Sequence, residues 1–516
     1  MKKTQQFFAF VALVALAALA ALALLSTNIT QAGDITEAEA QRLQAIFQKS
    51  LEDKQAEIAA QTHRPRELVL KGDVTVEAAK TYYAITLPEL SLLYPAGNHI
   101  DIGLISLNAT PDSKPGQFKI TMSIPTPIIG FDIAEQETIR ITIGSQKSAG
   151  IWHEELQAFT KLDSTYNDIQ ITTKNKNKAA TIDNIRIIYD LEEDEDGNLS
   201  GPTQLEAKNI KISPDQWTQA SLGKIALTVT LDKFSPDIFK KNTDKNVIPA
   251  LDLADGAALK LQLENLEINK EKPNITTESF SFKQAGINFS YNETSNETIN
   301  ADFGFSFKDA SASSIPQALN DFIPKSGQIK LKHNNIPLAV IDETIKNATQ
   351  GGDTRLLGVS LLLKLPAILA AAESYIELYE TNIQNENYNI SLDSTIKADS
   401  TAANSVTATG VLRFIGLDKI LSLAQATKAD PSSLQYAAPI LSIANFLERV
   451  KPLARVETDE QNGFTHIFDL EMNKTGQFSI NGENALSLLS NHRQPTQPIQ
   501  PVEVYPGEVQ PLKDME

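Results

Sequence analysis

The sequence predicts an α+β fold, rich in β-strands, in which long antiparallel, meandering sheets have one dry face and are partly covered by amphipathic helices. Two observations carry this prediction. Apolar and polar residues alternate over many short segments, for example residues 118–124 and 303–307, and this period of two is typical of strands with one buried and one solvated face. Turn-forming pairs such as Asp196-Gly197 separate the segments.

The same alternation continues through the middle of the chain, in residues 139–143, 225–231 and 259–263. Amphipathic helical patterns are fewer than half-apolar strands. A sheet that is wider than its helices can cover leaves part of its dry face open, as a groove that suits acyl chains.

The first 32 residues have the order of an export signal. Lys2 and Lys3 precede an uninterrupted apolar run at residues 7–25, and Thr30 and Ala32 are small residues before a candidate cleavage site. The run is longer than the roughly 7–15 apolar residues of a cleaved signal peptide and close to the roughly 17–25 that span a bilayer. A cleaved signal peptide and a retained inner-membrane anchor at residues 7–25 both stay open. In either case we expect the remaining chain to be periplasmic or secreted.

Residues 34–61 predict an amphipathic helix that packs on a sheet. Thr36 and Glu39 have the spacing of a capping box, in which each side chain bonds the backbone N–H of the other residue. The apolar stripe recurs at helical spacing and consists of Leu43, Ile46, Phe47, Leu51 and Ile58. Because this helix begins directly after the apolar run, it favours cleavage over anchoring.

The chain divides into two expected domains and a tail. Residues 33–175 form the predicted helix and β-meander domain, and residues 181–492 form a mixed α+β domain. Residues 172–180, which are polar and lack apolar periodicity, predict the loop between them. Residues 493–516 contain Pro at five positions and predict an extended tail.

Four helices are expected in the second domain. Residues 317–323, 337–348 and 434–450 have helical apolar spacing. Residues 356–372 are nearly all apolar but interrupted by Lys364 and Pro366, so we expect a buried helix there, with an interfacial or lid helix as the alternative.

Composition limits the possible partners. The chain has no Cys, so it has neither disulfide bonds nor a thiol for lipid attachment. Its net charge is −18, which argues against nucleic acid, because nucleic acid binding rewards Lys and Arg. The acidity is also what keeps an exported protein in solution.

The histidines and the acidic run do not predict a site. His153-Glu154 lacks the second His of a zinc motif, and His466 falls on the dry face of a predicted strand, where a core histidine is the simpler interpretation. Asp194 and Asp196 imitate the start of a calcium loop. Thr203 replaces the bidentate Glu and the flanking segments are strand-like, so a solvated hairpin is favoured.

Two serine-enzyme motifs also fail on their context. Ser394 and Lys397 fit SxxK, and the run KTG begins at Lys474. Ser394 lies in a strand-like run and no SxN motif stands between the two. Trp152 and Trp217 are isolated and are expected to be core or turn anchors. The sequence therefore assigns no catalytic, cofactor-binding or metal residue.

The C-terminal part has a distinctive pattern. Residues 464–472 alternate, KTGQFSING follows at residues 474–482, and Leu486 begins a further apolar stretch. This hairpin resembles the uncharacterised YdgA-like exported proteins of Gram-negative bacteria, a domain of unknown function. The plan of an N-terminal membrane segment followed by long meandering strands resembles AsmA-like envelope proteins. The resemblance is specific over about twenty residues. It implies a periplasmic location and a role in envelope lipid homeostasis, and it carries no catalytic residue.

Two functions follow as expectations, and a third, a hydrolase with an unrecognised site, stays open although the expected motifs are missing. The first is a non-enzymatic periplasmic protein, without cofactor or metal, that binds lipid or another apolar ligand in the cell envelope. The second is a structural or scaffolding envelope protein that acts on protein partners through its acidic surface and its tail.

Overall fold

The computed structural model describes most of the chain between residues 35 and 485. The described residues are 35–60, 67–154, 156, 158–173, 178–213, 215, 217–236, 254–272, 275–295, 298–313, 317–341, 343, 357–429, 434–459 and 463–485. The expected export segment and the Pro-rich tail lie outside them. No described helix is both long enough and apolar enough to cross a membrane.

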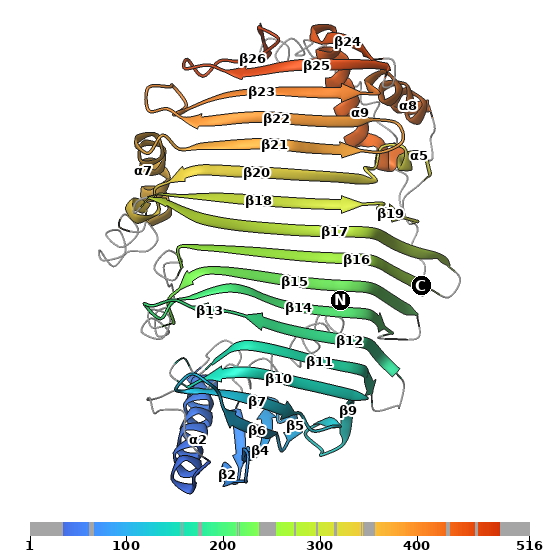
Figure 1. Ribbon diagram of the computed structural model, residues 1–516. Coiled ribbons are helices and arrows are strands. Elements are labelled where there is room, and N and C mark those ends of the chain that lie inside the picture. Colours follow the sequence, from blue (N-terminus) through green and yellow to red (C-terminus); the bar gives the residue numbers. More distant parts are fainter. Residues whose placement is uncertain are drawn as a thin grey trace, which may run out of the picture.

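The strands form one antiparallel network of 27 strands among the described residues, which confirms the prediction of a β-rich α+β fold with few helices. Figure 1 shows its arrangement: the long strands lie side by side in chain order, with a small folded unit at the N-terminal end of the sheet and helices at the C-terminal end.

The N-terminal unit consists of two arms that join the same long strand. One arm is β2 (Thr75–Ala78), β3 (Tyr83–Thr86), β6 (Ser106–Pro111), β7 (Gln117–Ser123) and β10 (Ser145–His153). The other is β1 (Glu67–Lys71), β4 (Glu89–Leu93), β5 (His99–Gly103), β8 (Ile128–Phe131) and β9 (Glu137–Thr142). Both arms pair with β11 (Ala158–Thr173).

The first core lies between these arms and α2 (Glu37–Ala60). The apolar stripe expected for this helix is buried from Leu43 to Leu51. Phe47 stacks on Trp152 of β10 with 5.5 Å between ring centroids. The helix therefore packs on a sheet, as its periodicity predicts.

From β11 the sheet continues as a plain meander. Its strands in order are β12 (Lys178–Asp190), β14 (Leu199–Ile212), β15 (Thr218–Phe234), β16 (Gly256–Lys272), β17 (Ile275–Ser295), β18 (Thr298–Lys308), β20 (Ser326–Ile336), β21 (Tyr375–Gln384), β22 (Asn389–Ala398), β23 (Val406–Ile415) and β25 (Gly463–Met472). Short strands flank them: β13 (Glu192–Glu193), β19 (Ser311–Ala312), β24 (Arg455–Asp459), β26 (Phe478–Ile480) and β27 (Glu483–Asn484).

The expected loop at residues 172–180 is shorter than its composition predicts. The β11–β12 ladder extends as far as the pair of Thr172 with Lys178, and residues 174–177 lie outside the described chain. The sheet continues across the position, and the division into domains there stays a prediction.

The second core lies at the other end of the sheet. Helices α8 (Leu417–Ala429) and α9 (Leu434–Val450), followed by the 3₁₀ helix η2 (Lys451–Leu453), cover β22, β23 and β25. Leu417 of α8 is fully buried, as are Phe414 of β23 and Phe468 of β25. The bounds of α9 are those that its apolar spacing predicts.

The remaining helices differ from the expectations. Helix α5 (Gln317–Asn320) ends in a turn before Ile323, and of residues 337–348 the structure describes helix at 338–341 and 343. Helix α7 (Leu357–Ala371) has nearly the expected bounds. Its described side chains, residues 364–371, are half-buried or exposed, so the expectation of a buried helix is wrong for this part.

A transverse crease crosses the long strands near the first core. Asp168, Asn209 and Asn265 have left-handed backbone conformations on the alternate strands β11, β14 and β16, with φ of 54°, 51° and 53°. The ladders continue on either side of these positions without pairing them. A left-handed residue inside a strand interrupts its pleat, and the strands in this part of the sheet are bent (Figure 1).

Candidate functional site

One row of side chains crosses the whole meander on a single face of the sheet. Residues paired in an antiparallel ladder share a face, so the register can be followed from strand to strand. The row runs from β12 to β25 through Ile187, Leu205, Leu227, Leu261, Ile287, Phe305, Ile329, Thr381, Leu392, Leu412 and Phe468. A bulge at Glu380, whose φ is 46°, accommodates the step from β20 to β21.

The two ends of this row are buried and its middle is open. Ile187 belongs to the first core and is 3% exposed, and Phe468 belongs to the second and is 2% exposed. Ile287, by contrast, is 38% exposed. The dry face is thus covered at both ends of the sheet, and the described residues leave it uncovered between them.

The open part is a patch of large apolar side chains on β16, β17, β18 and β20, which we name the apolar strip. Its members are 37–42% exposed. Their pairing places them in two adjacent rows on one face. They are Leu259, Ile287, Phe289, Phe303, Phe305 and Ile329.

The opposite face of the same strands is polar. The residues that alternate with the strip include Lys260, Asn288 and Lys330, which the register also aligns. The strip is therefore the dry face of an amphipathic sheet, as the sequence alternation predicts. A monomeric protein seldom leaves such a continuous apolar patch in contact with water unless the patch binds something.

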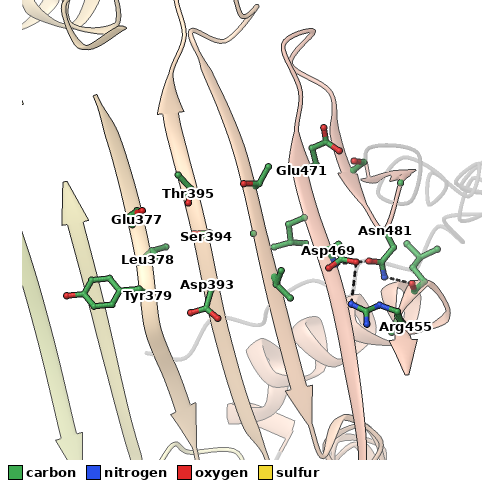
Figure 2. A pocket seen from close by; sticks show the side chains of 18 of the residues that line it. Glu377, Leu378, Tyr379, Asp393, Ser394, Thr395, Arg455, Asp469, Glu471 and Asn481 are labelled. Atoms are coloured by element: carbon green, nitrogen blue, oxygen red, sulfur yellow. Dashed lines mark hydrogen bonds and ion pairs between the residues drawn. The ribbon is translucent and has the colours of Figure 1, made fainter. Parts of the chain in front are cut away.

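A separate hollow lies on the polar face of the C-terminal strands. It has a volume of about 1210 Å³ and is lined mainly by β21, β22, β23 and β25. Figure 2 shows it with the strands as its floor and acidic side chains such as Glu377, Asp393 and Asp469 around it. Basic partners are fewer, with Lys332 and Arg455 in the lining.

The polar groups of this hollow are largely used within the protein. Asp393 forms an ion pair with Arg413 at 3.1 Å, and Asp469 lies 3.8 Å from Arg455. Asn481 donates to the carbonyl oxygens of Leu453 and Ile467 and so fixes the wall (Figure 2).

Tyr379 lines the hollow and carries a hydroxyl that bears on its chemistry. Burial, and then the charge of Asp302, raise the pKa of the Tyr379 hydroxyl. That hydroxyl donates to Asp302 at 3.4 Å. A phenol with a raised pKa stays protonated at neutral pH, so it is a hydrogen-bond donor and not a base. In the part of the chain that the structure describes, no three His, Asp or Glu side chains are placed to share a metal ion.

The acidic run at Asp194 is a hairpin, as the sequence analysis favours. Asp194 Oδ1 accepts hydrogen bonds from the backbone N–H groups of Asp196 and Asn198, both at 2.9 Å. These bonds hold the pKa of Asp194 below its usual range. The carboxylate is engaged in closing its own turn between β13 and β14.

The SxxK and KTG motifs do not form a site. Ser394 and Lys397 are three residues apart on β22, so they point to opposite faces. Lys474 lies in the turn before β26, where its Nζ contacts Asp399 at 3.1 Å.

Both histidines named above are structural. His153 is buried, accepts the N–H of Leu156 at Nδ1, and faces Glu193 at 3.4 Å. His466 is buried on the dry face in line with Phe414, and burial lowers its pKa. Trp152 is a core anchor at 1% exposure, whereas Trp217 is exposed beside a turn.

Sequence reasoning found part of the apolar strip. The alternation at residues 259–263 and 303–307 indicates its members on β16 and β18, and the same alternation is present at Ile287 and Phe289 of β17. Helices from distant parts of the sequence cover some of these half-apolar strands and not others. The local alternation of residues therefore does not predict which strands are covered.

Comparison of the chain with protein-family models, with curated proteins and with solved structures finds no match. The resemblance to YdgA-like and AsmA-like proteins therefore stays a prediction.

Proposed function

We propose that this protein is a non-enzymatic binding protein for lipid or another ligand with an acyl chain, and that the apolar strip is where the chain binds. The observation that carries the proposal is the open middle of a row whose two ends are buried in cores. The energy of binding comes from covering this exposed apolar surface, at about 25 cal/mol per Å² removed from water.

The dimensions support an acyl chain. The strip crosses four strands, from β16 to β20, so three inter-strand steps of about 4.8 Å give roughly 15 Å. This is about half of the roughly 30 Å hydrocarbon core of a bilayer, and so about the length of one leaflet's acyl chains. The strip offers no charged group on its own face, which favours an apolar ligand over a polar one.

The exported, periplasmic or secreted, location and the role in the envelope belong to this proposal as well. They are supported by the order of the first 32 residues.

Titration of the purified protein with a fluorescent fatty acid tests the proposal. We expect saturable uptake by the unaltered protein, and at least about tenfold weaker binding by Phe305→Asp, because a carboxylate in the strip must be desolvated when an acyl chain covers it. Ser306→Asp is the matched control, since Ser306 is the next residue of β18 and lies on the polar face. It should bind as the unaltered protein does.

Native mass spectrometry of protein purified from its host provides a second measurement. Protein that carries no lipid and takes up no fluorescent fatty acid would contradict the proposal. Equal weakening by both substitutions would place the ligand elsewhere.

A further inference from the structure

Helix α7 has an apolar surface that is too broad for a helix packed on one side. Its fifteen residues contain a single charge, Lys364. In the sequence, Ser360, Lys364, Ala367 and Ala371 recur at helical spacing, and the three whose side chains the structure describes, Lys364, Ala367 and Ala371, form one narrow arc of small or polar residues. The rest of the helix sequence, which makes up the broad arc, is Leu, Ile and Val apart from Gly358, Pro366 and Ala370. Helices that are apolar nearly all round are found in cores or in membranes.

The structure does not place the described side chains of α7, residues 364–371, in a core. The helix lies at the side of the sheet where the strands end, beside the ends of β20 and β21 (Figure 1), and contacts β22. Neither core includes a described residue of α7. Lys364 and Ala367 on the narrow arc are exposed, and Leu365, Ile368 and Leu369 on the broad arc are only half-buried.

The helix is fastened to the sheet on the same face as the apolar strip. Ser374, between α7 and β21, is buried, and its hydroxyl donates to the carbonyl of Asn334 at 3.1 Å. His333 Nε2 lies 2.8 Å from that hydroxyl and must be the donor, because the hydroxyl proton is already used. His333 aligns with Ala301 on β18 and Ile376 on β21. This row is on the face of the strip, so α7 adjoins the strip's edge.

A position in the plane of a bilayer interface fits this surface better than a transmembrane position. Fifteen residues at about 1.5 Å each give roughly 22 Å, which is shorter than the roughly 30 Å hydrocarbon core. A helix of this length with one narrow polar arc suits a position in the plane of the interface. The net charge of −18 and the single lysine of α7 favour electrically neutral headgroups over anionic ones.

We propose that α7 docks the protein on a neutral lipid bilayer and so brings the edge of the apolar strip to the membrane surface, an inference that rests on the proposed lipid binding. The acyl chain would then pass from the bilayer to the apolar strip at the side of the sheet where the strands end.

The absence of Cys allows a local test in the full chain. Ile368→Cys, labelled with an environment-sensitive fluorophore, is mixed with phosphatidylcholine vesicles that contain spin-labelled lipid. We expect the emission to shift to the blue and to be strongly quenched. Lys260→Cys on the polar face is the control and should be unaffected. Because the readout is local, vesicle binding by the apolar run at residues 7–25 does not produce the signal.

A second measurement separates this inference from the proposed function. In the double variant Leu365→Gln and Ile368→Gln, we expect the rate of fluorescent fatty acid uptake from vesicles to fall about tenfold. Binding of the same fatty acid from solution should be unchanged, since the strip is intact. Leu365 and Ile368 are only half-buried, so the fold should persist, and circular dichroism checks it.

Three outcomes overturn the inference. The first would be a label at position 368 that is not quenched although the protein binds vesicles. The second would be an emission that shifts with protein concentration in the absence of vesicles, which would mean that a second copy of the protein covers α7. The third is normal uptake from vesicles by the double variant. If the unaltered protein did not bind the fatty acid from solution, this result would instead contradict the proposed function.

Discussion

Arg42 and Glu154 form the ion pair that fastens α2 to the sheet. Glu154 at the end of β10 is buried, with 1% of its side chain exposed. Arg42 contacts both of its carboxylate oxygens and also binds Glu39. These hydrogen bonds, with that to Glu39 the larger, raise the pKa of Arg42, so Arg42 remains charged. A buried carboxylate is tolerated only because its partner stays in place.

Replacing Arg42 with Ala should destabilise the protein by about 3 kcal/mol, because it leaves the Glu154 charge buried without a partner. Urea denaturation measures this change. Arg186→Ala is the control, since the pair of Arg186 with Asp163 is about half exposed on both sides and should contribute at most about 1 kcal/mol. The double change Arg42→Ala and Glu154→Leu should recover most of the loss. Similar effects of Arg42→Ala and Arg186→Ala would contradict this account.

The same arginine explains why the capping box of α2 is only half formed. Thr36 accepts the N–H of Glu39 at 3.2 Å, as expected. The N–H of Thr36 donates instead to the hydroxyl of Tyr83 on β3, and the Glu39 carboxylate binds Arg42. The reciprocal half of the predicted box is therefore wrong, because Tyr83 takes the N–H of Thr36 and Arg42, one turn further along the same helix, takes the carboxylate of Glu39.

At the level of the element, the transverse crease depends on residues that tolerate a left-handed backbone. Asn209 donates from Nδ2 to Asp183 on the neighbouring strand at 2.9 Å. On β15, Gly223 lies against Asn265, and a Cβ there would be 3.1 Å from the Asn265 side chain. Asn and Asp are the non-glycine residues that adopt this conformation most readily.

Asn209→Val should therefore lower the free energy of unfolding by about 1–2 kcal/mol, the usual cost of a left-handed backbone for a branched residue. Asn209→Gly should cost less, since glycine removes the strain and loses only the bond to Asp183. Lys211→Val, on the same strand and exposed, controls for the change in strand propensity. The denaturation midpoints of the three variants measure these costs. An equal loss of stability in Asn209→Val and Lys211→Val would rule out backbone strain at position 209.

At the level of the whole molecule, the sheet has two cores at its ends and an open strip between them. Each long strand of the meander pairs with the long strands that come before and after it in the chain, as in repeat proteins, where stability is close to a sum of local terms. The two cores are contributed by separate stretches of the described chain. A defect in one core should therefore have little effect on the other.

Hydrogen exchange of two core variants measures this independence. Leu417→Ala removes a fully buried side chain of the second core and should cost about 2–5 kcal/mol. We expect faster amide exchange in α8, α9 and β22 to β25, and unchanged exchange in α2 and β10. Phe47→Ala in the first core should give the reverse pattern. Faster exchange at both ends in either variant would show instead that the sheet unfolds as a unit.

The sequence by itself determined the local structure of this protein. Alternation with period two gives the strands, helical spacing gives α2 and the bounds of α9, and Asp196-Gly197 gives a hairpin, because each of these signals lies within a few residues. It also indicated that helices are too few to cover the dry face. It could not say where the face is open.

Only the tertiary structure decided which strands are covered and which side chains meet. Arg42 and Glu154 are 112 positions apart, and the row from Ile187 to Phe468 depends on the register of every ladder between them. Ile287 and Ile187 carry the same side chain on the same face, yet one is open and the other buried. The difference arises because burial depends on what packs above a strand, and the covering elements come from distant parts of the chain.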